Sequence, residues 1–533
     1  MWPADRLSGP YERVTLSLLV ECRSPMHLGS GRSLPRFAEN EALDCAALCV
    51  DPAGRRFIPG ASWRGLLRAL VVRLLEDRPA KEATLEALFG SAKRAQEGSQ
   101  SESPATLENI GRQGALRVFD TLVSDSVSSS TQTQVAIDPV TGTALEAHLF
   151  STELLPAGTQ LELRLLLERV EGEQVSLLLD ALQRLDSDPL ARLGSGKSQG
   201  WGQLRVIGST PTAAAGGETV TSHKPPLDRD AETALRFELR VLTRAAFVSW
   251  LAETAQPGTE LADYFETVTL TRPRSTHLGD ECRLLELSLR PLEPLLIGQA
   301  AESNGDPARH EQRRNHLLAR VALDADGEPT AIVPGSSLKG LLRGRTGRIL
   351  RTIAHTQIGQ VDNQQVDALL ARLFGSPSHG RGCLWLSDAV GALPTDEPCL
   401  ERVLIGIDRF TGGNSSGALF EAHCVFPAAL HTRLWLSEAW LPEPERAPIR
   451  LLLAFLLRDL LEGDMRLGWG KARGLGGFDA TLLGFDSVDW LAWPALMHEP
   501  GFLAWLGDRE TAHALLLDWL RGRTPIASEE AHP

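Results

Sequence analysis

A duplicated set of motifs constrains the fold more than any other feature of this sequence. Residues 58–69 read IPGASWRGLLRA, and residues 333–344 read VPGSSLKGLLRG. Five further landmarks recur in the same order around these two stretches. They are an apolar β-like stretch (14–29 and 284–298), an LFGS motif (88–91 and 373–376), a strand ending in Asp-Thr or Asp-Ala (114–121 and 382–389), an Ile-Asp…Leu-Phe segment (135–150 and 405–426, the second with a longer turn) and a glycine-rich loop (193–204 and 467–478). Each copy spans about 190–200 residues, an ordinary domain length, so the duplication predicts two tandem domains of the same fold.

The alternation of apolar and polar residues predicts a mixed α+β architecture for each copy. TQLELRLLLE at 159–168 alternates as a strand does, whereas the segments after both Pro-Gly turns have a helical pattern. We therefore expect helices packed on one face of a sheet in each domain. The first domain is predicted at 1–207 and the second at 236–482, with strands between 236 and 282 added to the second sheet.

Three other segments fall outside these two predicted cores. Residues 208–235 are rich in Gly, Pro, Ser and Thr, which is typical of a linker. Residues 92–113 form a polar insert in the first copy only, and we expect a mobile loop there. The tail at 483–533 has an amphipathic helical pattern and is expected to pack on the second domain.

Composition limits the classes of protein to which the chain can belong. Hydrophobic residues make up 43% and charged residues 23% of the 533, as in a folded globular protein. No run approaches the roughly 18 apolar residues that cross a bilayer, and the N-terminus lacks a basic signal-like region, so we expect a cytoplasmic protein without a membrane partner. Seven cysteines without a Cys-x-x-Cys pair predict no structural zinc site. The net charge of −14 means that any polyanion must bind in a local cationic groove.

The two Pro-Gly turns predict helix starts that favour phosphate. Serine after such a turn is a good N-cap, and the free N–H groups of a helix start attract anions. Cations four residues apart then lie together on one face of each helix. A plain strand–turn–helix with solvated cations would also fit one copy, but recurrence of the whole pattern favours phosphate binding. The candidate residues are Ser62, Arg64, Arg68, Ser336, Ser337, Lys339 and Arg343.

The glycine-rich loops predict phosphate contact of a different kind. GSGKSQG at 194–200 resembles a Walker A loop, but that motif needs glycine where Ala191 stands, and Ala472 occupies the magnesium-ligand position of the second copy. An NTPase is therefore disfavoured. Glycines still let backbone amides approach phosphates while lysine supplies charge, although a simple turn between a helix and the last strand is the alternative. The candidate residues are Gly194, Gly196, Lys197, Ser198, Gly200, Gly468, Gly470, Lys471, Arg473 and Gly474.

Taken together, these motifs resemble the RAMP superfamily, the backbone subunits of type III CRISPR effector complexes, over most of the chain. The resemblance implies an RRM-like (ferredoxin-like) fold with a thumb β-hairpin in each half. It also implies guide (CRISPR) RNA, complementary target RNA and other effector subunits as partners, and the tandem arrangement resembles the fused subunits of the III-D branch. The thumbs would lie at 121–147 and 389–422. Candidate wedges between bases are Leu122, Val123, Leu393 and Pro394.

The resemblance also implies a catalytic position. Cleaving members of the family carry an aspartate between the first strand and the Pro-Gly turn, and Asp44 matches it. Such a residue would activate the RNA 2′-hydroxyl or hold a divalent metal, Mg²⁺ or Mn²⁺, near the scissile phosphate. Leu317 occupies the matching position of the second copy, so metal-dependent endoribonuclease activity is expected mainly in domain one.

Two other functions stay open at this point. A catalytically silent RNA-binding scaffold is one, and the missing second aspartate supports it. A guide-precursor processing ribonuclease is the other, which would need a general acid–base pair such as His with Lys or Tyr. His27, His148 and His423 lie near the motifs and are interpreted as structural or RNA-contacting.

Overall fold

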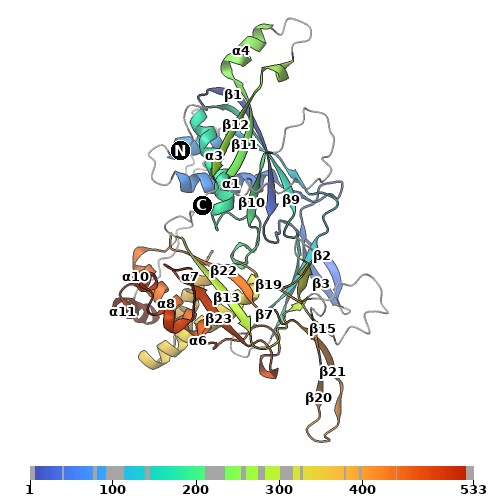
Figure 1. Ribbon diagram of the computed structural model, residues 1–533, viewed down its shortest axis with the longest axis vertical. Helices are drawn as coiled ribbons and strands as arrows, with labels where there is room; N and C mark the ends of the chain where they lie inside the picture. Colours follow the sequence, from blue (N-terminus) through green and yellow to red (C-terminus); the bar gives the residue numbers. More distant parts are fainter. Residues whose placement is uncertain are drawn as a thin grey trace, which may run out of the picture.

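The computed structural model of the chain describes most of its residues and gives two similar α+β repeats (Figure 1). The described ranges are 7–38, 41–75, 81–91, 113–138, 144–209, 234–253, 260–273, 282–299, 316–323, 328–376, 380–394, 399–439 and 441–523. The predicted mobile loop and most of the predicted linker lie outside them. Within these ranges, no helix combines the length and apolar character needed to cross a membrane.

The first repeat has a six-stranded antiparallel sheet in the order β12-β11-β1-β9-β5, with β10 also paired to β1. Strand β9 alternates buried leucines with exposed polar residues, as its sequence predicts, and α1 and α3 pack against one another beside the sheet. Its elements are β1 (Tyr11–Cys22), β2 (Gly29–Ala38), β3 (Glu41–Leu48), β4 (Phe57–Ile58), α1 (Gly60–Leu74), α2 (Lys81–Phe89), β5 (Leu116–Val118), β6 (Thr121–Leu122), β7 (Ser130–Ile137), β8 (Ala144–Leu154), β9 (Gln160–Val170), α3 (Gly172–Ser187), the 3-10 turn η3 (Lys197–Gln199), β10 (Leu204–Ser209), β11 (Ala234–Thr243), α4 (Arg244–Glu253), η5 (Leu261–Tyr264) and β12 (Glu266–Pro273).

The second repeat has an eight-stranded sheet in the order β16-β17-β19-β22-β13-β23-β24, with β18 also paired to β22. Helices α9 to α11 lie in the C-terminal tail and pack on α8. Its elements are β13 (Cys282–Pro291), β14 (Gly298–Gln299), β15 (His316–Ala319), β16 (Val321–Leu323), β17 (Pro329–Val333), α6 (Gly335–Gln357), α7 (Asn363–Phe374), β18 (Leu384–Leu386), β19 (Ala389–Ala392), β20 (Leu400–Ile407), β21 (Asn414–Cys424), β22 (Leu430–Ser437), α8 (Glu443–Leu461), η6 (Lys471–Arg473), β23 (Phe478–Leu483), β24 (Trp490–Leu491), α9 (Trp493–Leu496), α10 (Pro500–Leu506) and α11 (Arg509–Leu520).

Each repeat has its own hydrophobic core, which confirms the prediction of two domains with one α+β fold. The boundary between them differs from the prediction, however. Strand β11 pairs with β1 and β12 pairs with β11, so residues 234–273 extend the first sheet and not the second. The second repeat therefore begins at β13. Leucines on one face of β11 alternate into the first core, where Leu235 and Leu239 are buried.

A long β-hairpin leaves each sheet, and the second hairpin projects away from the body of the protein (Figure 1). The hairpins are β7–β8 and β20–β21, which begin and end later in each repeat than the hairpins predicted at 121–147 and 389–422. Their turns have equal length, because Ile137 pairs with Ala144 and Ile407 pairs with Asn414 in equivalent positions. The expectation of a longer second turn is therefore wrong.

Candidate nucleic-acid interface

The two Pro-Gly turns start helices as predicted, but their caps differ from the prediction. Proline is the N-cap in both repeats and the helix begins at the following glycine. The Gly60 N–H donates to Asp120 Oδ1 at 2.7 Å, and the Gly335 N–H donates to Asp388 Oδ1 at 2.7 Å. Each helix start thus already carries an anion, supplied by the strand that ends in Asp-Thr or Asp-Ala. The expected serine N-caps are wrong: Ser62 and Ser337 are the third residues of their helices, and Ser336 is the second.

The arginines of these helices bind carbonyl groups inside their own repeats. The Arg64 guanidinium donates to the Phe89 carbonyl at the end of α2. Arg343 Nη1 donates to the Gly375 carbonyl, just beyond the end of α7, at 3.0 Å. Cations at helix C-termini are favourable because they complement the helix dipole. Arg68 is exposed and leaves its helix toward solvent.

The glycine-rich loops need glycine for their backbone shape. Gly196 and Gly200 flank η3 with φ of 65° and 105°, and Gly470 and Gly474 flank η6 with φ of 76° and 73°. Only glycine adopts these left-handed conformations without strain. Gly194 and Gly468 have positive φ as well. The repeated glycines therefore have a conformational explanation, whichever ligand the loops bind.

The first glycine-rich loop packs against the second Pro-Gly turn, and this contact joins the repeats. Lys339 Nζ on α6 donates to Ser198 Oγ at 2.6 Å. A Cβ added at Gly335 would lie 2.2 Å from the Gln199 carbonyl oxygen, so the two backbones touch there. Gln134 Nε2 of strand β7 donates to Ser336 Oγ at 3.1 Å across the same contact. Five predicted residues therefore meet in one place, which we call the seam: Lys197, Ser198, Gly200, Ser336 and Lys339.

A buried arginine that the sequence did not single out holds the seam together. Arg192 is fully buried and lies over the rings of Trp385 and Trp435, with centroid distances of 5.4 and 4.8 Å. Its guanidinium donates to the carbonyl groups of Pro189 and Lys197, both at 2.8 Å. Arg192 thereby fixes the first glycine-rich loop on aromatic rings of the second repeat. The sequence signal for it was an arginine just before the loop in both copies.

The two seam lysines are half-buried cations. Burial lowers the pKa of Lys339 from 10.5 to about 8, with the nearby Arg343 adding repulsion. Burial also lowers the pKa of Lys197 from 10.5 to about 8, and Arg381 adds to this effect. In the described part of the chain, neither lysine forms an ion pair with a carboxylate. Cations of this kind are stabilised by an external anion.

The other copies of these two motifs, the second glycine-rich loop and the first Pro-Gly turn, have exposed residues at or beside them. Lys471 and Arg473 of the second glycine-rich loop are exposed, and Arg473 lies 4.8 Å from the centroid of the Trp469 ring. Asp120, the counterpart of Asp388, is exposed, and 44% of the neighbouring Phe119 is exposed. By contrast Gly200 covers Asp388, and burial raises the pKa of that carboxyl above 3.8.

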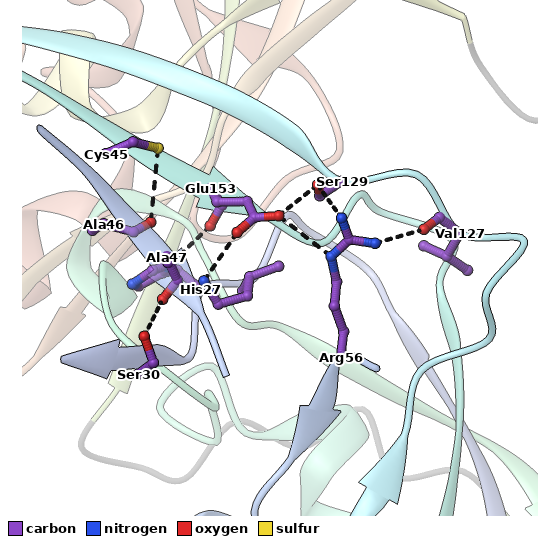
Figure 2. A network of polar contacts seen from close by, with 10 residues as sticks. His27, Ser30, Cys45, Ala46, Ala47, Arg56, Val127, Ser129 and Glu153 are labelled. Atoms are coloured by element: carbon purple, nitrogen blue, oxygen red, sulfur yellow. Dashed lines mark hydrogen bonds and ion pairs between the residues drawn. The ribbon is translucent and has the colours of Figure 1, made fainter. Parts of the chain in front are cut away.

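Asp44 lies on β3, opposite Pro35 of β2, and β3 pairs in parallel with the hairpin strand β8. The Asp44 side chain lies outside the described residues, as does that of His148. Nearby, Glu153 on β8 accepts hydrogen bonds from Ser129 Oγ at 2.7 Å and from Arg56 Nε at 3.3 Å (Figure 2). The Glu153 carbonyl lies 2.7 Å from His27 Nδ1, so His27 is a structural residue at the root of the hairpin.

Two of the four candidate wedges face the core. Val123 and Leu393 are only 5% and 7% exposed, so the prediction that they reach bases is wrong. Leu122 is 49% exposed but lies on β6, outside the hairpins, and Pro394 is also outside them. The hairpins carry other exposed apolar side chains in their place. They are Val135, Ile137, Leu145, Leu149, Phe150, Val403, Ile405, Ile407 and, at the second tip, Phe410.

The fold and the seam define a tandem α+β protein with two half-buried lysines at the junction between its repeats. A family model of the RAMP superfamily matches residues 19–205 and 288–479, one region in each repeat. These regions cover more than half of the chain, which therefore belongs to the RAMP superfamily. Membership indicates a CRISPR-associated, RNA-binding subunit. No curated protein matches the chain.

Proposed function

We propose that this protein is a guide-RNA-binding backbone subunit of a type III CRISPR effector, related to the fused subunits of the III-D branch. The observation that carries the proposal is the pair of lysines in the seam, which are half-buried and have no carboxylate partner among the described residues. An RNA backbone supplies the phosphates that such cations need. Because the charge lies in one place, binding is compatible with the overall charge of −14.

The strand order supports an RRM-like fold in each repeat. In the first sheet β10, β1, β9 and β5 are consecutive antiparallel neighbours, while the chain visits them in the order β1, α1, β5, β9, α3, β10. The second repeat has the matching arrangement of β23, β13, β22 and β18. This is the order of a split βαβ ferredoxin-like unit.

The exposed apolar side chains along the hairpins support contacts with RNA bases that do not depend on the base sequence. Val403 and Ile407 are each 61% exposed and Phe410 is fully exposed at the tip of the second hairpin. Apolar and aromatic side chains of this kind stack on or wedge between any bases, as guide binding requires.

Asp44 is the residue to which we assign target cleavage. It lies beside the root of the first hairpin, and the second repeat lacks an aspartate at the matching position. One carboxylate is an incomplete ligand set, and phosphate oxygens of bound RNA are ligands that Mg²⁺ ordinarily shares with a protein carboxylate. The metal would polarise the scissile phosphate.

Asp44→Ala is expected to abolish one cut in complementary target RNA, by about 10³-fold or more in rate, without changing target affinity. The test uses the complex reconstituted with guide and end-labelled target, with and without EDTA. Asp51→Ala is a matched control, because Asp51 is a nearby turn carboxylate that binds Arg55. Identical cleavage patterns in all three proteins would leave the non-catalytic scaffold as the function.

The exposed residues beside the first Pro-Gly turn and on the second glycine-rich loop support contacts with neighbouring subunits. Each such contact would resemble the seam between the two repeats. A glycine-rich loop from a neighbour would cover Asp120 and Phe119 as Gly200 covers Asp388. A heterologous contact repeated in this way builds an open stack.

Phe119→Asp is expected to weaken association with that neighbour by at least about tenfold, because it places a charge in the contact. Subunit stoichiometry in the reconstituted complex, measured by mass, checks this. Val248→Asp serves as the control. Val248 is 58% exposed on α4, which belongs neither to a Pro-Gly turn nor to a glycine-rich loop. Unchanged assembly of Phe119→Asp would contradict a neighbour at this surface.

A further inference from the structure

We propose that the root of the β20–β21 hairpin binds a divalent transition-metal ion through Glu401, Glu421 and His423. Each of these residues offers one ligand atom, and the three atoms all lie within 4.8 Å of one another. An ion bound at about 2.0–2.2 Å from its ligands holds them roughly 3.5 Å apart, so small rotations of the side chains complete the site.

The hairpin ladder places the three side chains together. Glu401 on β20 pairs directly with His423 on β21, and Glu421 lies two residues before His423 on the same strand. Side chains two residues apart point to the same face of a strand, as do directly paired residues on neighbouring strands. The ladder continues to the end of the hairpin, so the positions of the three ligands are fixed by backbone pairing.

The ligand types select the class of metal. Imidazole suits Zn²⁺, Fe²⁺ and other transition metals, whereas Mg²⁺ and Ca²⁺ prefer ligand sets made of oxygen alone. One imidazole with two carboxylates therefore suits Zn²⁺ or Mn²⁺.

The first repeat shows that this set is not a general feature of the fold. The equivalent ladder positions there hold Thr131, Ser151 and Glu153, with Thr131 paired to Glu153. The single carboxylate of that set is neutralised by Arg56 and receives the Ser129 hydroxyl (Figure 2).

The second repeat has other residue types at the positions of Arg56 and Ser129. Ala331 occupies the position of Arg56 on the equivalent strand, and Cys399 occupies the position of Ser129. Metal-ligating side chains have thus replaced the hydroxyl groups of the first repeat, while its arginine is absent.

The site also bears on RNA binding, although it does not depend on it. Glu401 shares a strand face with the exposed Val403 and Ile405. A divalent ion bound at the foot of that apolar row would place positive charge where a nucleic-acid backbone could approach.

Titration of the full chain with Mn²⁺, followed by electron paramagnetic resonance, tests the proposal. Mn²⁺ is chosen because it prefers carboxylate over thiolate, so the seven free cysteines contribute little. We expect the wild type to bind one equivalent, and His423→Asn and Glu401→Gln to weaken that binding by at least about 100-fold. A parallel titration with Zn²⁺ by calorimetry should show the same loss.

The matched controls are His355→Asn and Glu462→Gln, which change exposed residues of the same types on α6 and at the end of α8. Thermal melts without metal establish that each variant is folded, and a Mn²⁺-induced rise in Tm is expected for the wild type and controls only. Glu401 is exposed, so its variant remains informative even where His423→Asn fails to fold. Wild-type protein without stoichiometric binding, or Glu401→Gln with wild-type affinity, would overturn the proposal.

Discussion

Replacing Gly335 by alanine is expected to open the seam, although the change adds a single methyl group. A Cβ at this position would lie 2.2 Å from the Gln199 carbonyl oxygen and 3.1 Å from the Ser387 carbonyl carbon. Gln199 belongs to the first repeat, so the methyl group would have to move one repeat relative to the other. Overpacking of this kind costs about 1–3 kcal/mol, and we expect the free energy of unfolding to fall by that amount.

Gly340→Ala is the matched control for this experiment. Gly340 lies on the same helix, and a Cβ added there meets nothing within 4 Å. Alanine is a better helix former than glycine by about 0.5–1 kcal/mol, so this variant should be slightly more stable than the wild type. Equilibrium denaturation followed by tryptophan fluorescence measures both changes. If Gly335→Ala is at least as stable as the wild type, the repeats do not press on each other at Gly335.

The sequence predicts the duplication and the α+β class correctly because their signals are local. A Pro-Gly turn followed by a helix, or alternation along β9, is visible within a few residues. The helix caps could not be predicted in the same way. Asp120 and Asp388 cap helices that begin many residues earlier in the chain, and only the folded strand brings them there. The serines satisfied the local rule for an N-cap, but the carboxylates occupy the helix starts.

Errors in the boundaries have the same physical origin. Strands β11 and β12 follow the predicted linker, so proximity in sequence favoured the second sheet. In the structure β11 pairs with β1 and β12 pairs with β11.

The wedges and the hairpin turns were also misjudged from local sequence. Val123 and Leu393 have the apolar character of a wedge, but each is buried in the core. The similar letters Glu-Ala-His at 146–148 and 421–423 suggested a longer second turn, while the ladder pairs show turns of equal length.

The sequence names the lysines of the seam as candidates one by one, but it does not predict that they lie at one contact. Lys197 and Lys339 were identified in separate motifs, one in each repeat. Their meeting depends on how the repeats dock, which involves Arg192, Trp385 and Trp435. No spacing rule connects residues so far apart in the chain. The duplication shows that two equivalent surfaces exist, and only the fold shows that one copy of each is used within the molecule.

Changing both seam lysines to glutamine is expected to reduce RNA affinity by about 10²-fold. Hydrogen bonds to charged groups contribute about 1.5–3 kcal/mol each, and the two are not fully additive. The dependence of affinity on salt should also become shallower, by about 0.7 for each phosphate of single-stranded RNA that the variant no longer neutralises. Lys81→Gln is the control, because Lys81 lies on α2 outside the seam. Filter binding of guide-length RNA at several salt concentrations measures both quantities.

The same lysines predict how pH acts on the protein. Their pKa of about 8 in the folded chain lies below the 10.5 of free lysine, so the unfolded chain holds more protons between these values. Stability of the RNA-free protein should therefore rise with pH from about 8 to about 10.5. RNA affinity should fall as pH rises through about 8, because phosphate binds only the protonated amines.

A second double variant distinguishes the titration of the seam lysines from other effects of pH on RNA affinity. Arginine stays protonated throughout this pH range, so Lys197→Arg with Lys339→Arg should keep RNA affinity nearly constant between about pH 7 and about pH 9. The wild type should lose affinity over the same interval, and the glutamine variant should be weak at every pH. If the glutamine variant binds RNA as tightly as the wild type with an equal salt dependence, the seam does not hold the RNA backbone.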